Sequence, residues 1–194
     1  MDKLLTVVIP SYNVEKFLNQ TLDSFVCDEA VMKKFEVIVV DDGSKDNTAK
    51  VGKEYADKYP DTFRVISKEN GGHGSTINCG IRNAVGKYFK VVDGDDWVNT
   101  ADFVKLVEDL EKTESEYVFT NYYEYYDDVN RQKAVDFPQF KDGTEYDFAD
   151  VANKVYIPMH ALVIKTSVLK DNNIVIDEKC FYVDAEYVIF PLPY

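Results

Sequence analysis

The segment that determines the fold of this chain is Val91-Val92-Asp93-Gly94-Asp95-Asp96-Trp97. A β-branched segment ends there in three carboxylates within four residues. Strand ends are where open α/β sheets place their ligands. Because like charges at this spacing repel one another, we expect a positive partner among them, most simply a divalent cation. This acidic turn is therefore the first candidate site.

Four strand-length segments, three of them strongly apolar, alternate with helical patterns over the first 110 residues. The strands are expected at residues 5–9, 35–40, 63–67 and 88–92, and the helices at about residues 17–25, 46–59, 75–85 and 100–110, the last capped by Thr100. Such alternation predicts repeated βαβ units, and hence an α/β fold with a parallel sheet and right-handed crossovers.

Three of these strands end in polar turns, at residues 10–13, 41–44 and 93–96. The carboxyl ends of parallel strands meet at one edge of a sheet, where ligands bind. The pattern alone therefore predicts that these three turns gather into one site.

The second half is expected to extend the sheet with mixed strands and short helices. Strands are predicted at residues 117–119, 161–165 and 174–176, a tyrosine-rich hairpin pairs residues 121–128 with 134–140, and short helices cover 146–154 and 167–171. We find no linker, repeat or low-complexity run, so residues 1–194 are interpreted as a single domain with halves 1–115 and 116–194.

Composition excludes several classes of function. The formal net charge is -13, which argues against nucleic acid and against an anionic membrane surface, because both are bound through Lys and Arg. The three cysteines are far apart and form no CxxC pair, as in a reduced cytoplasmic protein. The segment at residues 190–194 is apolar with no polar tail, so we expect the natural protein to be longer.

Four motifs in order resemble the family 2 glycosyltransferases of GT-A fold. They are the segments Val8–Asn13, Val39–Ser44, Asn70–Gly80 and Val92–Asp96. The resemblance covers most of the chain and implies an inverting hexosyltransferase. Such an enzyme uses a nucleotide-diphosphate sugar, with UDP-sugar favoured, and a glycan, lipid-linked or cell-surface polymer acceptor.

The Asp93-Gly94-Asp95 triplet resembles the DXD motif of that family, which implies that Asp95 and Asp93 bind Mg²⁺ or Mn²⁺. The physics agrees, since these cations take carboxylates together with substrate phosphates. Asp96 is expected to cap the following turn instead. A purely structural acidic turn is the alternative.

The nucleotide side of the site is implied by the same resemblance. Pro10 and Tyr12 would cradle the nucleobase, with Tyr12 stacking on it, and Asp42 would read the uracil imide beside Asp41. Ordinary turn chemistry is the alternative for Asp41 and Asp42. Asn70 and Gly72 match a conserved Asn-x-Gly segment. Where the family often has Arg, this chain has Ile77, and a compensating cation would come from the set Lys68, His73 and Arg82.

Asp184 matches the general base of the family, in a motif where Val183 replaces the usual Glu. This leaves Glu186 as a rival base, and we expect only one of the two carboxyls to reach the site. We expect the base to be buried beside apolar neighbours. The alternative is that both acids merely favour a helix N-terminus.

Two other functions stay open. A degenerate, non-catalytic nucleotide-sugar-binding module would explain the departures at Ile77 and Val183. A sugar nucleotidyltransferase needs a glycine-rich basic loop near the N-terminus, which residues 10–16 do not provide. The resemblance is also compatible with a homodimer and with peripheral attachment to the inner face of the membrane through residues beyond Tyr194.

Overall fold

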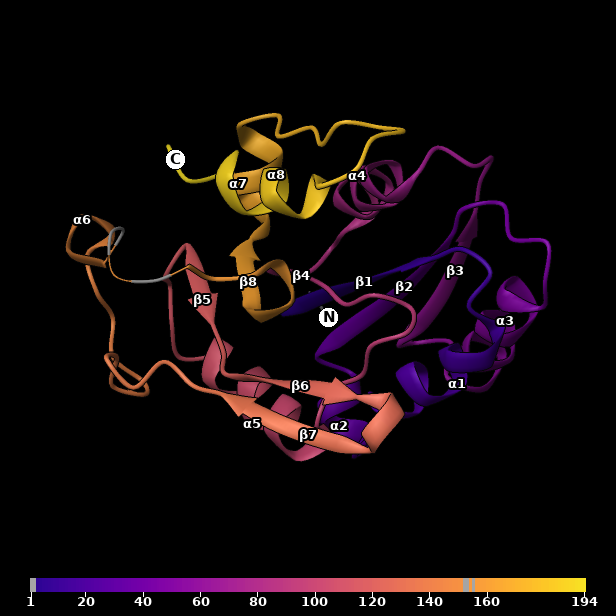
Figure 1. Cartoon of the computed structure of the whole chain (residues 1–194), viewed down its shortest axis with the longest axis horizontal. Coiled ribbons are helices and arrows are strands. Elements are labelled where there is room, and N and C mark those ends of the chain that lie inside the picture. Colours follow the sequence, from indigo (N-terminus) through magenta and orange to yellow (C-terminus); the bar gives the residue numbers. More distant parts are fainter. Residues whose placement is uncertain (1–2, 152–153, 155) are drawn as a thin grey trace.

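The computed structural model describes residues 3–151, 154 and 156–194 and contains a six-stranded sheet flanked by helices on both faces (Figure 1). The strand order is β3-β2-β1-β4-β8-β5. The strands of this sheet are β1 (Leu5–Ser11), β2 (Phe35–Asp41), β3 (Phe63–Ser67), β4 (Tyr88–Val91), β5 (Tyr117–Phe119) and β8 (Leu162–Lys165). The α-helices are α1 (Glu15–Asp23), α2 (Glu29–Met32), α3 (Thr48–Lys58), α4 (His73–Asn83), α5 (Thr100–Leu110), α6 (Phe148–Val151), α7 (Thr166–Asp171) and α8 (Val183–Ile189).

The first four strands are parallel, as the βαβ pattern predicts. Ser11 lies opposite Asp41 at the ends of β1 and β2, and Val8 lies opposite Val91 in β4. The polar turns that follow these three strands therefore leave the sheet at the same edge, which confirms the expected convergence.

Alternation along the strands divides the core into two apolar layers. In β1, Leu5, Val7 and Ile9 pack with α1 and α5, whereas Val8 faces the opposite layer with α4, α7 and α8. Figure 1 shows α4, α7 and α8 on one side of the sheet and α1, α2 and α5 on the other. Both faces of the central strands are covered, which explains their continuous apolar runs.

The second half extends the sheet, as expected. Strand β8 pairs antiparallel with both β4 and β5. A separate hairpin, β6 (Tyr122–Tyr126) with β7 (Arg131–Val135), forms its own two-stranded sheet. Its return strand begins earlier than the predicted residue 134, because a 3-10 turn at Asp127–Val129 and Asn130, with a φ of 46°, reverse the chain there. Helix α6 lies within the predicted range 146–154, of which residues 152 and 153 are outside the described part.

Two local predictions are wrong. Residues 174–176 do not form a strand, because the Asn78 side chain takes both backbone groups of Ile176: the Ile176 N–H donates to Asn78 Oδ1 at 2.9 Å, and Asn78 Nδ2 donates to the Ile176 carbonyl at 2.7 Å. Helix α5 is capped by Asn99, not Thr100, since Asn99 Oδ1 accepts from the N–H groups of Ala101 and Asp102. In the described part of the chain, no helix has both the length and the apolar character that a membrane crossing requires.

Candidate active site

The acidic turn is fixed against the end of β1. The Gly94 N–H donates to the Pro10 carbonyl at 3.1 Å, and the Thr21 hydroxyl of α1 donates to the Gly94 carbonyl at 3.0 Å. A Cβ at position 94 would lie 2.9 Å from Val14 Cγ2 and 3.0 Å from the Pro10 oxygen, so the close approach requires glycine. The backbone that carries the flanking aspartates is therefore held by both β1 and α1.

Asp93 and Asp95 present carboxylates at this turn. The Asp93 side chain is 35% exposed, and its Oδ1 lies 2.8 Å from Nε2 of His73. Because an ionised carboxylate only accepts, Nε2 carries the proton in this pair. Burial alone lowers the pKa of His73, but the hydrogen bond to Asp93 and the nearby acidic charges outweigh it and raise that pKa. Asp95 is exposed.

Among the described residues, the Asp96 side chain makes no hydrogen bond that caps the following turn, and Asp96 contributes to this turn through its backbone. Its backbone N–H closes the turn by donating to the Asp93 carbonyl at 3.0 Å. Partial burial, reinforced by the charges of Asp93 and Asp95, raises the pKa of Asp96 to about 6. The donor set of Asp93 and Asp95, two accessible carboxylates among crowded negative charge, fits a hard divalent cation that shares further ligands with a substrate.

Asp42 is a buried anchor for the glycine-rich turn. Its carboxylate accepts from the N–H groups of Gly71 and Gly72 at 2.9 and 2.8 Å and from Lys68 Nζ at 2.6 Å. Asn70 Nδ2 donates to the Asp42 carbonyl at 3.0 Å. The structure thus brings Asp42, Asn70 and Gly72 together, and Lys68, expected only as a candidate compensating cation, is the half-buried partner of Asp42.

The other nucleotide-side residues lie at the ends of β1 and β2. Asp41 is 4% exposed, and its Oδ1 accepts from the Ser44 N–H at 3.0 Å, which closes the turn after β2. Tyr12 follows β1 directly and is 47% exposed. Of these two, Tyr12 has the accessible side chain.

The glycine-rich turn is also clamped from its other side by the C-terminal segment. The Lys179 N–H donates to the Gly71 carbonyl at 3.0 Å. A Cβ at Gly74 would lie 2.0 Å from the Asp177 oxygen, so the first turn of α4 presses directly on this segment. The clamp brings His73, at the start of α4, close to the segment that leads into α8.

Asp184 and Glu186 both lie in the first turn of α8 but point to different partners. Asp184 lines a pocket with His73 and Asp93, whereas Glu186 Oε2 accepts from the Asp177 N–H at 2.8 Å. Asp184 is exposed, so the expectation of a buried base is wrong. Of the two carboxyls, that of Asp184 is the one that lines the pocket.

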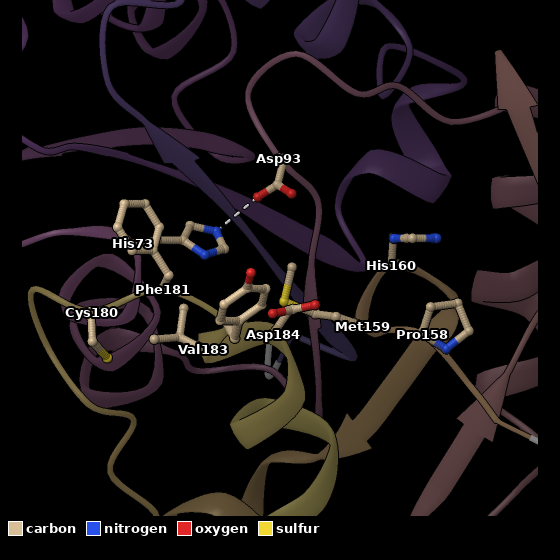
Figure 2. Close-up of a pocket in the computed structure, with 10 residues that line it drawn as sticks. His73, Asp93, Pro158, Met159, His160, Cys180, Phe181, Val183 and Asp184 are labelled. Carbon is tan, nitrogen blue, oxygen red and sulfur yellow. Dashed lines mark hydrogen bonds and ion pairs between the residues drawn. The ribbon is translucent and has the colours of Figure 1, made fainter. Parts of the chain in front are cut away.

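The pocket has a volume of about 320 Å³ and gathers residues from distant parts of the chain (Figure 2). Its lining comprises His73, Asp93, Pro158, Met159, His160, Cys180, Phe181, Tyr182, Val183 and Asp184. Figure 2 shows His73 and Asp93 pointing toward each other, with Asp184 and His160 around the same space. Of the predicted site residues, Asp93 and Asp184 line this pocket, while Pro10, Tyr12, Asp41, Asp42, Asn70, Gly72, Gly94 and Asp95 do not.

A buried lysine lies beneath one wall of the pocket. Lys90 is 4% exposed, and its Nζ donates to the His160 carbonyl at 2.6 Å. Burial lowers the pKa of Lys90 to about 8. Burial, and then the charge of Lys90, lowers the pKa of His160, whose ring contacts that of Tyr122 with centroids 4.9 Å apart. Sequence reasoning missed Lys90, although a lysine inside an otherwise apolar strand was the available signal.

Comparisons with a family model and with curated proteins agree on one family. The family model described as Glycosyl transferase family 2 matches residues 6–172. An uncharacterized glycosyltransferase of Bacillus subtilis, EpsJ, is 37% identical over 123 residues, which cover 63% of this chain and 35% of the relative. The minor teichoic acid biosynthesis protein GgaB of the same organism is 32% identical over 111 residues, covering 57% of this chain and 12% of the relative.

Solved structures show the same architecture. Residues 1–349 of TarS from Staphylococcus aureus superpose with a TM-score of 0.77 at 26% identity, covering 97% of this chain and 54% of that chain. The mannosyltransferase PcManGT of Pyrobaculum calidifontis, in complex with GDP-Man and Mn²⁺, gives a TM-score of 0.69 at 19% identity, covering 98% and 52%. These likenesses confirm the expected GT-A fold. The chain spans about half of these solved chains and about a third or less of the curated relatives.

Proposed function

Because the chain belongs to glycosyl transferase family 2, we propose that it is an inverting, metal-dependent glycosyltransferase. It would move a sugar from a UDP-sugar to a glycan, lipid-linked or cell-surface polymer acceptor. The observation that carries this proposal is the shared pocket of Asp93 and Asp184. One carboxylate for the donor side and one for the acceptor side meet there, although they are far apart in the sequence.

In the proposed donor site, Asp93 and Asp95 hold Mg²⁺ or Mn²⁺. The turn offers two carboxylates rather than a closed cage, which suits a cation that also takes phosphate oxygens. The bound ion supplies positive charge that stabilises the diphosphate as it leaves. PcManGT was solved with Mn²⁺, which supports a divalent ion.

The nucleotide side of the proposed site lies at the strand ends and the glycine-rich turn. It consists of Pro10, Tyr12, Asp41, Asp42, Asn70, Gly72 and Gly94. The exposed Tyr12 ring is available to stack on a base. Asp42 acts chiefly by fixing the glycine-rich turn, because its carboxylate already accepts from Lys68, Gly71 and Gly72. Asp42 Oδ2 accepts only from the Gly72 N–H among these donors and keeps acceptor capacity, but because Asp42 is 3% exposed the turn would have to open for a uracil imide to reach it.

The proposed chemical step assigns proton transfer to Asp184. Its carboxylate takes the proton of an acceptor hydroxyl while that oxygen attacks the anomeric carbon of the donor sugar. The new bond forms from the acceptor oxygen to this carbon as the bond to the diphosphate breaks on the opposite side, so the anomeric configuration inverts. The exposure of Asp184 in the pocket leaves it accessible to an acceptor.

The donor class is tested by a thermal-shift panel of UDP, GDP, ADP, CDP and dTDP with Mn²⁺. A nucleotide that binds the folded state raises the melting temperature. We expect UDP to give the largest shift, since TarS was solved with UDP-GlcNAc and with UDP, and GDP is the second candidate because of PcManGT. No shift with any nucleotide would refute the proposal.

A non-catalytic binding module is the second candidate. Val183 replaces the usual Glu of the acidic motif and is only 3% exposed, so it adds no acid to the site. Donor hydrolysis measured with and without Mn²⁺ separates the two: turnover supports the enzyme, and binding without turnover supports the module.

The acceptor and the location are also proposals. GgaB is described as a minor teichoic acid biosynthesis protein, which favours a cell-surface polymer as the acceptor class. The three cysteines are free thiols, as in a reduced compartment, which supports the cytoplasm at the inner face of the membrane.

A further inference from the structure

The lining of the pocket is poor in positive charge. It contains two carboxylates, Asp93 and Asp184, and its basic side chains are two histidines, with no lysine or arginine among the lining residues. A donor diphosphate entering this pocket needs hydrogen-bond donors from the protein as well as from a cation. Among the lining side chains, His73, His160 and Tyr182 carry hydrogen-bond donors, and of these only the two histidines can also carry a positive charge.

His73 is the better placed of the two. Its Nε2–H points at Asp93 Oδ1 from 2.8 Å, so its donor already lies at the predicted metal ligand (Figure 2). The His160 ring instead packs edge-on against Tyr122. His73 is also the first residue of the 11-residue helix α4, whose positive end adds to the attraction for an anion.

Lys68 and Arg82, the other two candidates for a compensating cation, are engaged elsewhere or lie apart. Lys68 Nζ donates to Asp42 Oδ1, to the Glu69 carbonyl and to Ser75 Oγ, at 2.6, 2.6 and 2.8 Å. Arg82 is exposed in the last turn of α4, at the opposite end of the helix from His73.

The backbone of His73 is fixed in place. Gly72, with a φ of 84°, leads into it and lies against the backbone of Lys179, and Gly74 has no room for a Cβ beside the Asp177 oxygen. The imidazole therefore turns about its own side-chain bonds while its Cα stays beside the pocket.

We propose that His73 is the protein's own hydrogen-bond donor to the diphosphate of the donor substrate, an inference that rests on the proposed function. Without a nucleotide, its Nε2–H is held by Asp93. When the donor binds, with or without the cation, the same N–H turns to a phosphate oxygen, and Asp93 would then be free to hold the cation. No proton leaves the ring, since one hydrogen-bond acceptor replaces another.

The test compares His73→Ala, His73→Gln and Arg82→Ala in the full 194-residue chain, with binding followed by two-dimensional NMR titration. UDP and uridine are titrated in EDTA, and Mn²⁺ is titrated separately. If wild type prefers another nucleotide in the panel above, that nucleotide and its nucleoside are used. The ratio of nucleotide to nucleoside affinity isolates the contribution of the diphosphate.

We expect His73→Ala to lower this ratio by roughly tenfold, the effect of one hydrogen bond to a charged group. His73→Gln keeps an N–H donor and should retain most of the ratio, and Arg82→Ala should leave it unchanged. Mn²⁺ affinity should stay equal or rise in His73→Ala, because Asp93 loses a competing partner.

An unchanged ratio in EDTA for His73→Ala would overturn the inference. If Mn²⁺ binding also became weaker in this variant, His73 would be only a support for Asp93. A wild-type protein that binds none of the nucleotides would instead refute the proposed function itself.

Discussion

Replacing Lys90 with methionine is expected to remove a pH dependence from the stability of the fold. Lys90 is buried in β4, and burial lowers its pKa from 10.5 to about 8. A difference of this size between the folded and unfolded states corresponds to about 3 kcal/mol. Its titratable neighbour across the contact is His160, whose carbonyl accepts from Lys90 Nζ.

The sign follows from proton binding in the two states. Between about pH 8 and pH 10.5 the unfolded chain keeps the Lys90 proton while the folded protein loses it, so the free energy of unfolding rises with pH in this window. Below about pH 8 both states are protonated, and the cost of the buried charge is constant. The free energy of unfolding of the wild-type protein should therefore rise by up to about 3 kcal/mol relative to that of Lys90→Met as the pH increases through this window.

At about pH 7 the two proteins should be closer in stability. Lys90→Met removes the buried charge but leaves the His160 carbonyl without its donor, which costs about 1–3 kcal/mol. Urea denaturation followed by circular dichroism at several pH values measures the difference, with Lys50→Met on the exposed face of α3 as the control. If the difference in free energy of unfolding between wild type and Lys90→Met stays constant from about pH 7 to about pH 10, the reasoning is refuted.

Further predictions concern the site. Asp95→Asn should weaken Mn²⁺-dependent nucleotide binding at least about tenfold without changing the melting temperature by much, and equal calorimetric affinities would contradict its role as a ligand. Asp42→Asn should destabilise the fold by about 2 kcal/mol, because the buried charge that accepts from Lys68 and from the Gly71 and Gly72 N–H groups is lost, and a negligible loss in chemical denaturation would contradict this. Asp184→Asn should abolish transfer while donor binding persists, whereas Glu186→Gln should keep most of the turnover; the reverse pattern in a steady-state assay would make Glu186 the base.

The parallel core of the fold could be read from the sequence because its signals are local. A run such as residues 5–9 has only one favourable setting, a strand covered on both faces, and its neighbours repeat the pattern. The polar turns after β1, β2 and β4 then had to meet at one edge, since parallel strands end together. The strand order, in contrast, required the long-range pairing of β8 between β4 and β5.

Predictions failed where a side chain from elsewhere changed the local outcome. Residues 174–176 have strand composition, but Asn78, distant in sequence, takes the backbone hydrogen bonds that a strand partner would have taken. The sequence shows two acids near residue 184 but not which of them faces the pocket. In the structure, Glu186 accepts from the Asp177 N–H, and Asp184 is the carboxylate that lines the pocket.

By itself, the sequence determined the βαβ core and the acidic turn at the end of β4, because apolar periodicity and strand-end chemistry depend on neighbouring residues. Only the tertiary structure decided which groups meet that turn. The pairing of His73 with Asp93 and the anchoring of Asp42 depend on how α4 packs between the sheet and the C-terminal segment, and Lys90 finds its acceptor in the His160 carbonyl. Such contacts join residues whose separation along the chain carries no periodic signal, so packing alone selects them.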